Sequence, residues 1–150
     1  MLTLRTPRPD EATILTELCL RSKAVWGYDK EFMRACRDEL RLTPSIMQSS
    51  HLKVAEIDGC LLGMVQVTVR GDFAELDKLF VEPTRLRSGA GRVLFNWARN
   101  MAREAGAVTL VIEADPDASG LYRRMGAVDD GVAPSGSMPG RFIPRLKLRL

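Results

Sequence analysis

A glycine-rich bend carries the residues whose types and spacing best suit chemistry, and it consists of Leu86, Arg87, Ser88, Gly89, Ala90, Gly91 and Arg92. A helix that begins near Gly89 would leave its first backbone N–H groups unpaired and would add partial positive charge at that end. Gly89 and Gly91 carry no side chains that would keep a phosphate away from these amides, and the arginines supply further donors. The bend therefore suits a diphosphate.

The two glycines of the bend could instead form only a tight turn between a strand and a helix. Two nucleotide-binding motifs do not fit the bend. It lacks the Gly-Lys-Ser/Thr ending of a P-loop, and it holds two of the three glycines of the dinucleotide fingerprint. The elements predicted around the bend are needed to distinguish an anion site from a simple turn.

The hydropathy pattern places the bend between a strand and a helix within a longer series of elements. Strands are predicted at residues 2–6, 52–57, 60–69, 73–81, 108–112 and 142–150, and helices at residues 11–25, 30–40, 45–50, 89–105 and 118–125. Asp58 and Gly59 form a dipeptide that favours a type I′ turn, so the second and third strands should form a hairpin. Between the last helix and the last strand, a loop is predicted at Pro134, Ser135, Gly136, Ser137, Pro139 and Gly140.

Individual side chains add detail to this assignment. Asp10 and Asp29 can cap the first two helices. Apolar residues at helical spacing give the first helix one stripe that should be buried, made of Ile14, Leu15, Leu18 and Val25. The cysteines are odd in number and widely spaced, which gives no disulfide framework and no metal pair and predicts buried thiols at Cys19, Cys36 and Cys60.

The composition is that of an ordinary globular protein. The 150 residues are 45% hydrophobic and 27% charged, and no apolar run approaches the roughly 20 residues that span a bilayer. The start of the chain shows no signal peptide, so we expect a cytoplasmic protein without membrane contact. The net charge is +3, with basic residues gathered at the bend and near the end of the chain. No nucleic-acid-binding motif accompanies them, so a small polyanion is the better-matched ligand.

The elements together predict an α/β (α+β) fold in which one mixed sheet carries helices on both faces. The chain shows no internal repeat and no linker. Residues 1–150 should therefore form a single domain.

The order of the elements and two motifs resemble the GCN5-related N-acetyltransferase (GNAT) family. The segment VEPTRLRSGAGRVL is similar to the family's acetyl-CoA pyrophosphate loop, and DPDASGLYRRMGAV is similar to its second cofactor motif. The resemblance covers nearly the whole chain and implies a mostly antiparallel central sheet. Leu86 stands where the family usually has Arg or Gln, and Asp117 stands where it more often has Asn.

The resemblance implies acetyl-CoA as co-substrate and no metal. The changed side chain at Leu86 leaves the cradle in place, because backbone N–H groups hold most of a diphosphate at such a site. The implied binding residues come from the strand before the bend, the bend and the second motif: Leu79, Phe80, Val81, Leu86, Arg87, Ser88, Gly89, Ala90, Gly91, Arg92, Asp117, Ala118 and Tyr122.

Tyr122 matches the position of the tyrosine that, in many family members, protonates the departing CoA thiolate. A phenol with a pKa near 10 is protonated at neutral pH and can donate to a thiolate whose acid has a pKa of about 8.5. Tyr122 could instead only pack the short helix. The resemblance therefore implies a general acid, with a structural role as the alternative.

A carboxylate could remove the proton from the substrate ammonium. The segment FAELDKLFV resembles the strand that carries the general base of the histone-modifying members, and Glu75 matches that base. Strand alternation would place Asp77 on the same face as Glu75 at a distance of about 7 Å, so the two could share the role. Glu113 is a third candidate, and each carboxylate could instead be solvated or ion-paired. Many family members use a chain of waters instead of one base.

The acceptor is expected to be a small-molecule or peptide amine held by residues outside the cofactor motifs. Trp26 and Tyr28, at a helix-helix corner, are candidates and could equally be core or lid packing. Ser135, Ser137 and Arg141 are candidates in the C-terminal loop, and Arg141 would suit a substrate carboxylate. No cysteine has an evident activating partner, which favours direct transfer in a ternary complex. Homodimers are common in the family.

Two other classes of function remain open at this stage. A protein that keeps the cradle but has lost the transfer chemistry would be a non-catalytic acyl-CoA-binding or sensing module. A basic interaction domain for RNA or an acidic protein is a third interpretation. The presence of Tyr122 favours the N-acetyltransferase.

Overall fold

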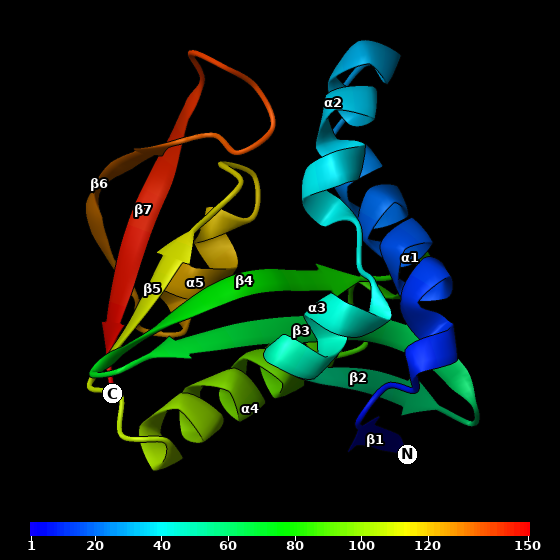
Figure 1. Cartoon of the computed structure of the whole chain (residues 1–150), viewed down its shortest axis with the longest axis horizontal. Coiled ribbons are helices and arrows are strands. Elements are labelled where there is room, and N and C mark those ends of the chain that lie inside the picture. Colours follow the sequence, from blue (N-terminus) through cyan, green and yellow to red (C-terminus); the bar gives the residue numbers. More distant parts are fainter.

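A seven-stranded sheet runs through the computed structural model, which describes residues 1–150 (Figure 1). Its strands are β1 (Leu2–Arg5), β2 (His51–Ile57), β3 (Cys60–Arg70), β4 (Phe73–Val81), β5 (Thr109–Glu113), β6 (Val128–Pro134) and β7 (Phe142–Arg149). The α-helices are α1 (Ala12–Ala24), α2 (Lys30–Leu40), α3 (Pro44–Ser49), α4 (Ala90–Glu104) and α5 (Ser119–Arg124). Two short 3₁₀ helices cover Pro9–Glu11 and Pro83–Arg85.

The strands lie in the order β1-β2-β3-β4-β5-β7-β6. Every neighbouring pair is antiparallel except β4 and β5, which are parallel. The prediction of one mixed, mostly antiparallel sheet is confirmed. The β2–β3 hairpin turns at Asp58 and Gly59 with φ angles of 49° and 78°, the positive values that a type I′ turn requires.

The parallel strands β4 and β5 stay together for only part of their length. Their pairing runs from Phe73 opposite Thr109 to Leu76 opposite Ile112, while β4 continues to Val81. At this point the pairing of β4 with β3 shifts by one residue, which leaves Asp77 without a partner as a β-bulge. The two strands therefore diverge beyond Leu76 and open a gap in the middle of the sheet.

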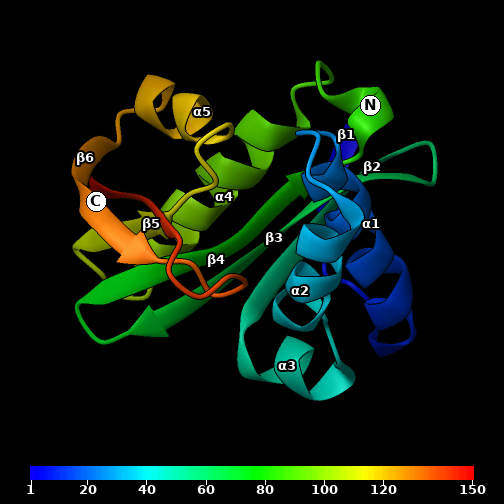
Figure 2. The same ribbon diagram turned by 90° about the horizontal axis from the view of Figure 1, so that it is seen from above.

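Two apolar cores lie on opposite faces of the sheet, with α4 on one face and α1 and α2 on the other (Figure 2). On the α4 face, Leu94 and Phe95 are fully buried. On the other face, Leu15, Cys36 and Met64 are fully buried between α1, α2 and β3. Burying a Leu, Phe or Met side chain contributes about 1.5–3 kcal/mol to the stability of the fold, so packing on both faces holds the diverging strands in place. Helices on both faces confirm the predicted layering.

Strand β6 was not predicted, whereas the loop predicted at residues 134–140 lies, from Ser135 on, between β6 and β7. Strand β6 pairs antiparallel with β7 at the edge of the sheet, with a register shift between Asp129 and Val132. Two aspartates and Gly131, which has a φ of 85°, interrupt the apolar alternation that identifies a strand. The pairing with β7 therefore forms without a clear local signal.

Several side chains in the N-terminal half also depart from expectation. Ile14 and Val25 are 54% and 45% exposed, because the buried face of α1 runs through Leu15 and its neighbours and α1 ends before Val25. Asp10 caps no helix, since it lies in the short 3₁₀ helix and pairs with Arg8. Asp29 does cap α2, by accepting a hydrogen bond from the Phe32 N–H at 2.8 Å. Cys19 and Cys36 are buried as predicted, whereas the thiol beside the hairpin turn is exposed at Cys60.

Candidate active site

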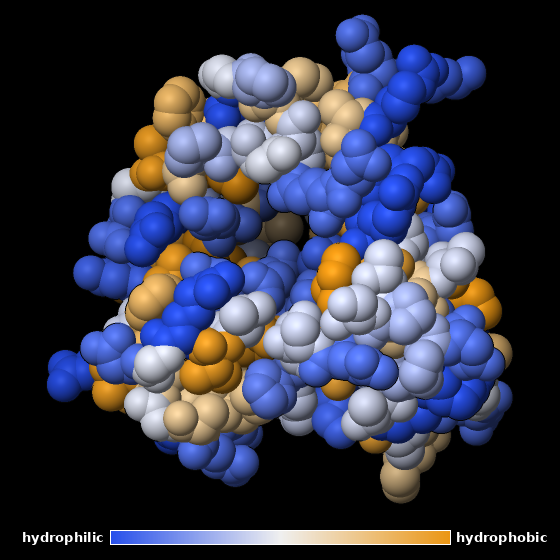
Figure 3. All heavy atoms as spheres, viewed as in Figure 1, coloured by the Kyte–Doolittle hydropathy of each residue, from blue (hydrophilic) through white to orange (hydrophobic).

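The gap between β4 and β5 forms a cleft of about 560 Å³, and Figure 3 shows the surface hollowed between its two halves. Small-molecule sites commonly have volumes of roughly 300–1,000 Å³. One end of the cleft, the bend end, is bounded by Leu86, Arg87, Gly89, Gly91 and Arg92. The opposite end, the α2 end, is bounded by Lys23, Trp26, Glu39, Asp115, Ser135 and Arg141.

The bend end is formed by the start of α4. Gly89 has a φ of +86° and immediately precedes the helix, a conformation that favours glycine. The first-turn N–H groups of α4 have no intrahelical acceptors, so they are available to an anion. A Cβ at Gly91 would lie 3.5 Å from Leu121 of α5, so a longer side chain would fill the space in front of these amides. Ser88 accepts a hydrogen bond from the Ala90 N–H at 3.3 Å and supports the bend from outside the cleft.

The free edge of β4 forms one long wall of the cleft. Leu79, Phe80 and Val81 line this wall. Beyond Leu76 the backbone of β4 has no partner on the side of β5. An extended ligand with amide groups could pair with these N–H and C=O groups as an added strand would.

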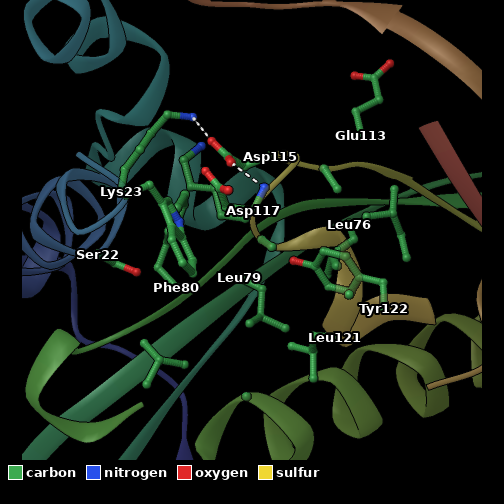
Figure 4. Close-up of a pocket in the computed structure, with 18 of the residues that line it drawn as sticks. Ser22, Lys23, Leu76, Leu79, Phe80, Glu113, Asp115, Asp117, Leu121 and Tyr122 are labelled. Atoms are coloured by element: carbon green, nitrogen blue, oxygen red, sulfur yellow. Dashed lines mark hydrogen bonds and ion pairs between the residues drawn. The ribbon is translucent and has the colours of Figure 1, made fainter. Parts of the chain in front are cut away.

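Tyr122 reaches the cleft from α5. Its ring is buried against Phe95, with ring centroids 5.7 Å apart, and its hydroxyl points into the cleft (Figure 4). Burial raises the pKa of Tyr122 far above its usual value, and the negative charge of Asp115 raises it further. The phenol is therefore protonated at neutral pH and can act as a donor.

Of the three candidate carboxylates, Asp77 and Glu113 line the cleft and Glu75 does not. The bulge at Asp77 breaks the simple alternation that would have placed it beside Glu75. The Glu75 carboxylate forms an ion pair with Arg70 at 3.1 Å. Asp77 accepts a hydrogen bond from the Thr68 hydroxyl at 2.5 Å, and its side chain is exposed where it lines the cleft. Partial desolvation of the carboxylate raises the pKa of Asp77, although the Thr68 hydroxyl lowers it in part.

At the α2 end, side chains from distant segments meet. The Tyr28 hydroxyl donates to Asp115 at 2.6 Å and accepts from Arg141 at 2.9 Å. The Lys23 ammonium lies 3.7 Å from the same Asp115 carboxylate (Figure 4). These three contacts hold the end of α1 and the segment before α2 close to the end of β5 and the segment before β7. Trp26, 42% exposed, completes this end of the cleft.

Comparison with known proteins identifies the family of the chain. Residues 17–127 match the model of the acetyltransferase (GNAT) family. The chain belongs to the GNAT family. No curated protein matches the sequence closely enough to count as a relative.

Solved GNAT structures share the fold over almost the whole chain. The PaiA N-acetyltransferase from Thermoplasma acidophilum, in complex with coenzyme A, is similar with a TM-score of 0.80 and 15% identity over 100% of this chain and 99% of that one. A GCN5-related N-acetyltransferase from Rhodopseudomonas palustris has a TM-score of 0.79 and 19% identity over 99% and 95% of the two chains. The ribosomal-protein-S18-alanine N-acetyltransferase from Escherichia coli has a TM-score of 0.73 and 17% identity over 99% and 94%.

The GNAT fold brings most of the predicted site residues to one cleft. The second motif contributes Asp117, Ala118 and Tyr122, and the first motif contributes the bend. Five predicted residues lie outside the lining, namely Tyr28, Glu75, Ser88, Ala90 and Ser137. Ala90 is buried under the bend, and the Ser137 hydroxyl donates to Glu39.

Sequence reasoning missed three charged residues that line the α2 end, Lys23, Glu39 and Asp115. Lys23 carries no local signal, because it is one of two basic residues in the last turn of α1. Asp115 does carry one, since it opens the second motif at the carboxyl end of β5 and its backbone and side chain fix the turn into α5. It accepts from the N–H groups of Asp117 and Ala118 at 3.0 and 2.9 Å.

The structure contains neither a cluster of metal-binding side chains nor a membrane-spanning helix. No group of three or more His, Cys, Asp or Glu side chains is arranged to hold a metal ion. None of the helices is long and apolar enough to cross a bilayer.

Proposed function

We propose that the protein is an acetyl-CoA-dependent N-acetyltransferase that transfers the acetyl group directly to a primary amine in a ternary complex. The observation that carries this proposal is that an anion-binding helix start and a protonated phenol, Tyr122, face the same cleft. Membership of the GNAT family supports it, as does the coenzyme A bound to the similar structure from Thermoplasma acidophilum.

The residues of the cleft fit the parts of acetyl-CoA. The bend can hold the diphosphate through the N–H groups of α4, with Arg87 and Arg92 as charged donors. The free edge of β4 suits the two amides of the pantetheine arm, which would run toward Tyr122. Glycine at position 91 keeps the diphosphate site open, since a longer side chain would fill it.

The transfer step forms one bond and breaks another. The amine nitrogen attacks the thioester carbonyl, the C–N bond forms and the C–S bond breaks. The Tyr122 hydroxyl gives its proton to the departing thiolate, while the ammonium proton leaves toward a carboxylate or a water. The raised pKa of Tyr122 keeps the proton in place until the thiolate forms beside it.

Asp77 is the best-placed base. It lines the cleft, and its raised pKa makes it a better proton acceptor than an ordinary aspartate. Glu75 lies outside the cleft in its ion pair with Arg70, so we assign it a structural role. Glu113 also lines the cleft and is exposed like Asp77, so it remains the alternative together with a water.

Direct transfer is supported by the state of the cysteines. Burial raises the pKa of the Cys19 thiol to about 12, so it carries no thiolate at neutral pH. Cys36 is also buried, and Cys60 lies outside the cleft. No cysteine is therefore suited to carry the acetyl group.

The acceptor is proposed to be a small-molecule or peptide amine at the α2 end, beside Trp26, Ser135 and Arg141. The similar enzyme from Escherichia coli is named for an alanine of ribosomal protein S18, which is a peptide amine. A cytoplasmic location and a homodimeric state remain predictions from the sequence.

The test is thiol release from acetyl-CoA over a panel of primary amines that includes amino acids, polyamines and peptides. We expect at least one amine to raise the release rate above the rate of hydrolysis, and the increase to be lost in Tyr122→Phe. Binding of CoA without amine-dependent release for any acceptor class would instead favour an acyl-CoA-binding module.

A further inference from the structure

Two stacked aromatic rings at the α2 end hold two cations against the cleft. The rings of Tyr28 and Phe32 have centroids 4.1 Å apart. The Arg141 guanidinium lies 4.8 Å from the Phe32 centroid and 5.3 Å from that of Tyr28, and the Lys23 ammonium lies 5.8 and 5.9 Å from the same two centroids. Lys23 and Arg141 line the cleft, whereas the two rings do not. The rings therefore form a platform that presents both cations to the cleft.

The two cations of this cluster are not equally paired with carboxylates. Asp115 is the carboxylate that contacts the cluster, through Lys23 directly and through the Tyr28 hydroxyl on the side of Arg141. Glu39 also lines this end, but it accepts a hydrogen bond from Ser137 and forms no ion pair with either cation. Lys23 is therefore paired with a carboxylate, whereas Arg141 contacts the neutral Tyr28 hydroxyl and forms no ion pair.

The cluster is also withdrawn from water. The side chains of Lys23 and Asp115 are only 14% and 12% exposed. A charge that is removed from water and left uncompensated is costly, so a ligand of opposite charge would be stabilised here. The cleft admits such a ligand because both cations line it.

The geometry of Arg141 favours a carboxylate. A guanidinium has five N–H donors in one plane, and one nitrogen of Arg141 donates to the Tyr28 hydroxyl at 2.9 Å. Its backbone is fixed by hydrogen bonds with Ser135 and Met138, so the side chain starts from a defined position. A fixed, stacked guanidinium matches the two oxygens of a carboxylate.

We propose that Lys23 and Arg141 form a carboxylate-binding subsite, and that the acceptor amine therefore also carries a carboxylate, as amino acids and short peptides do. This inference rests on the proposed acetyl transfer, because it names the class of acceptor. Asp115 and Tyr28 orient the two cations, and the acceptor carboxylate supplies the charged partner that Arg141 lacks.

The test uses two pools of product-like probes that differ only in charge. One pool holds N-acetyl amino acids, and the other holds the matching N-acetyl amino acid amides. Saturation-transfer NMR with the CoA-loaded and the CoA-free protein should show binding of the acids at least about tenfold tighter than binding of the amides, as expected for a charge-assisted pair. An equal response to both pools, including no response to either, would overturn the subsite.

Substitutions test which residues cause the preference for acids over amides. Lys23→Met and Arg141→Met should each reduce the acid-over-amide preference by about tenfold. Arg145→Met is the matched control, because Arg145 lies four residues away on β7 and pairs with Asp130 outside the cleft. An unchanged preference in both cleft variants would contradict the assignment even if the wild type prefers acids.

Parallel measurements separate this inference from the proposed function. Calorimetry with CoA and the thiol-release assay report on acetyl transfer alone. CoA binding without an acid preference would remove only the subsite. An acid preference without CoA binding would keep the subsite and contradict the N-acetyltransferase.

Discussion

The two ends of the cleft are built by different means. The bend end comes from one short stretch, residues 86–92, and its principal donors are backbone N–H groups at the start of α4. The α2 end is built from side chains that meet across the fold, such as Tyr28 and Arg141, which are 113 residues apart. A backbone site tolerates many side-chain changes but depends on glycine, whereas a side-chain site depends on every hydroxyl and charge within it.

This difference assigns separate kinetic effects to the two ends. Changes at the bend end should alter the KM of acetyl-CoA, and changes at the α2 end should alter the KM of the amine. Tyr122 and Asp77 line the same cleft, and changes to them should alter the chemical step. Each of the following substitutions tests one part of this division.

The largest effect is expected at Tyr122. Tyr122→Phe keeps the ring against Phe95 and removes only the proton donor, so folding and CoA affinity should survive while the rate of transfer falls. General acid catalysis contributes on the order of 10²- to 10⁴-fold, which sets the expected loss in kcat. A single-turnover measurement excludes product release, and a wild-type rate for Tyr122→Phe under those conditions would make Tyr122 a packing residue.

A smaller, pH-dependent effect is expected at Asp77. The raised pKa of Asp77 means that it loses its function as a base, as pH falls, at a higher pH than an ordinary aspartate would. Asp77→Asn should lower kcat/KM about tenfold at neutral pH, and the loss should shrink as pH approaches about 10, where a free amine is already deprotonated.

Glu75→Gln is the control for Asp77, because Glu75 lies on the same strand but outside the cleft. Its pH–rate profile should keep the acidic limb of the wild type, moved slightly to lower pH because the negative charge of Glu75 helps to raise the pKa of Asp77. If Glu75→Gln loses the acidic limb and Asp77→Asn keeps it, the assignment of the base is reversed.

The smallest effect is expected at Tyr28, the other tyrosine of the chain. Tyr28→Phe keeps the stack on Phe32 but removes the hydrogen bonds with Asp115 and Arg141. Each such bond contributes about 0.5–1.5 kcal/mol, so the KM of the amine should rise about fivefold while the KM of acetyl-CoA stays the same. Burial raises the pKa of Tyr28 to about 12, so this difference should not vary with pH in the neutral range. A change in the KM of acetyl-CoA instead would remove the separation between the two ends.

The same difference explains what could be predicted from the sequence. The bend end could be predicted because seven consecutive residues contain the glycines, the arginines and the start of the helix. Lys23 could not, because its role depends on Asp115, which only the fold brings near. The face of Asp77 was also hidden, since a bulge changes strand alternation without changing composition.

The sheet shows a similar limit. Strands β2 to β4 were predicted because their apolar residues and turns follow local rules, as at Asp58 and Gly59. Strand β6 was missed because it gains its strand structure from pairing with β7, while its own sequence contains two aspartates and Gly131. Long-range pairing thus defines the parts that local patterns do not.

The most direct test of the central claim is a calorimetric titration of the wild type and Gly91→Glu with CoA. The added side chain would place bulk and negative charge in front of the α4 amides, so binding should weaken at least about tenfold, or roughly 1.4 kcal/mol. Gly91→Ala is the control, because its Cβ would make only ordinary contact with Leu121 at 3.5 Å and should leave the affinity almost unchanged. Equal CoA affinity in wild type and a folded Gly91→Glu variant would contradict the claim that the bend holds the diphosphate.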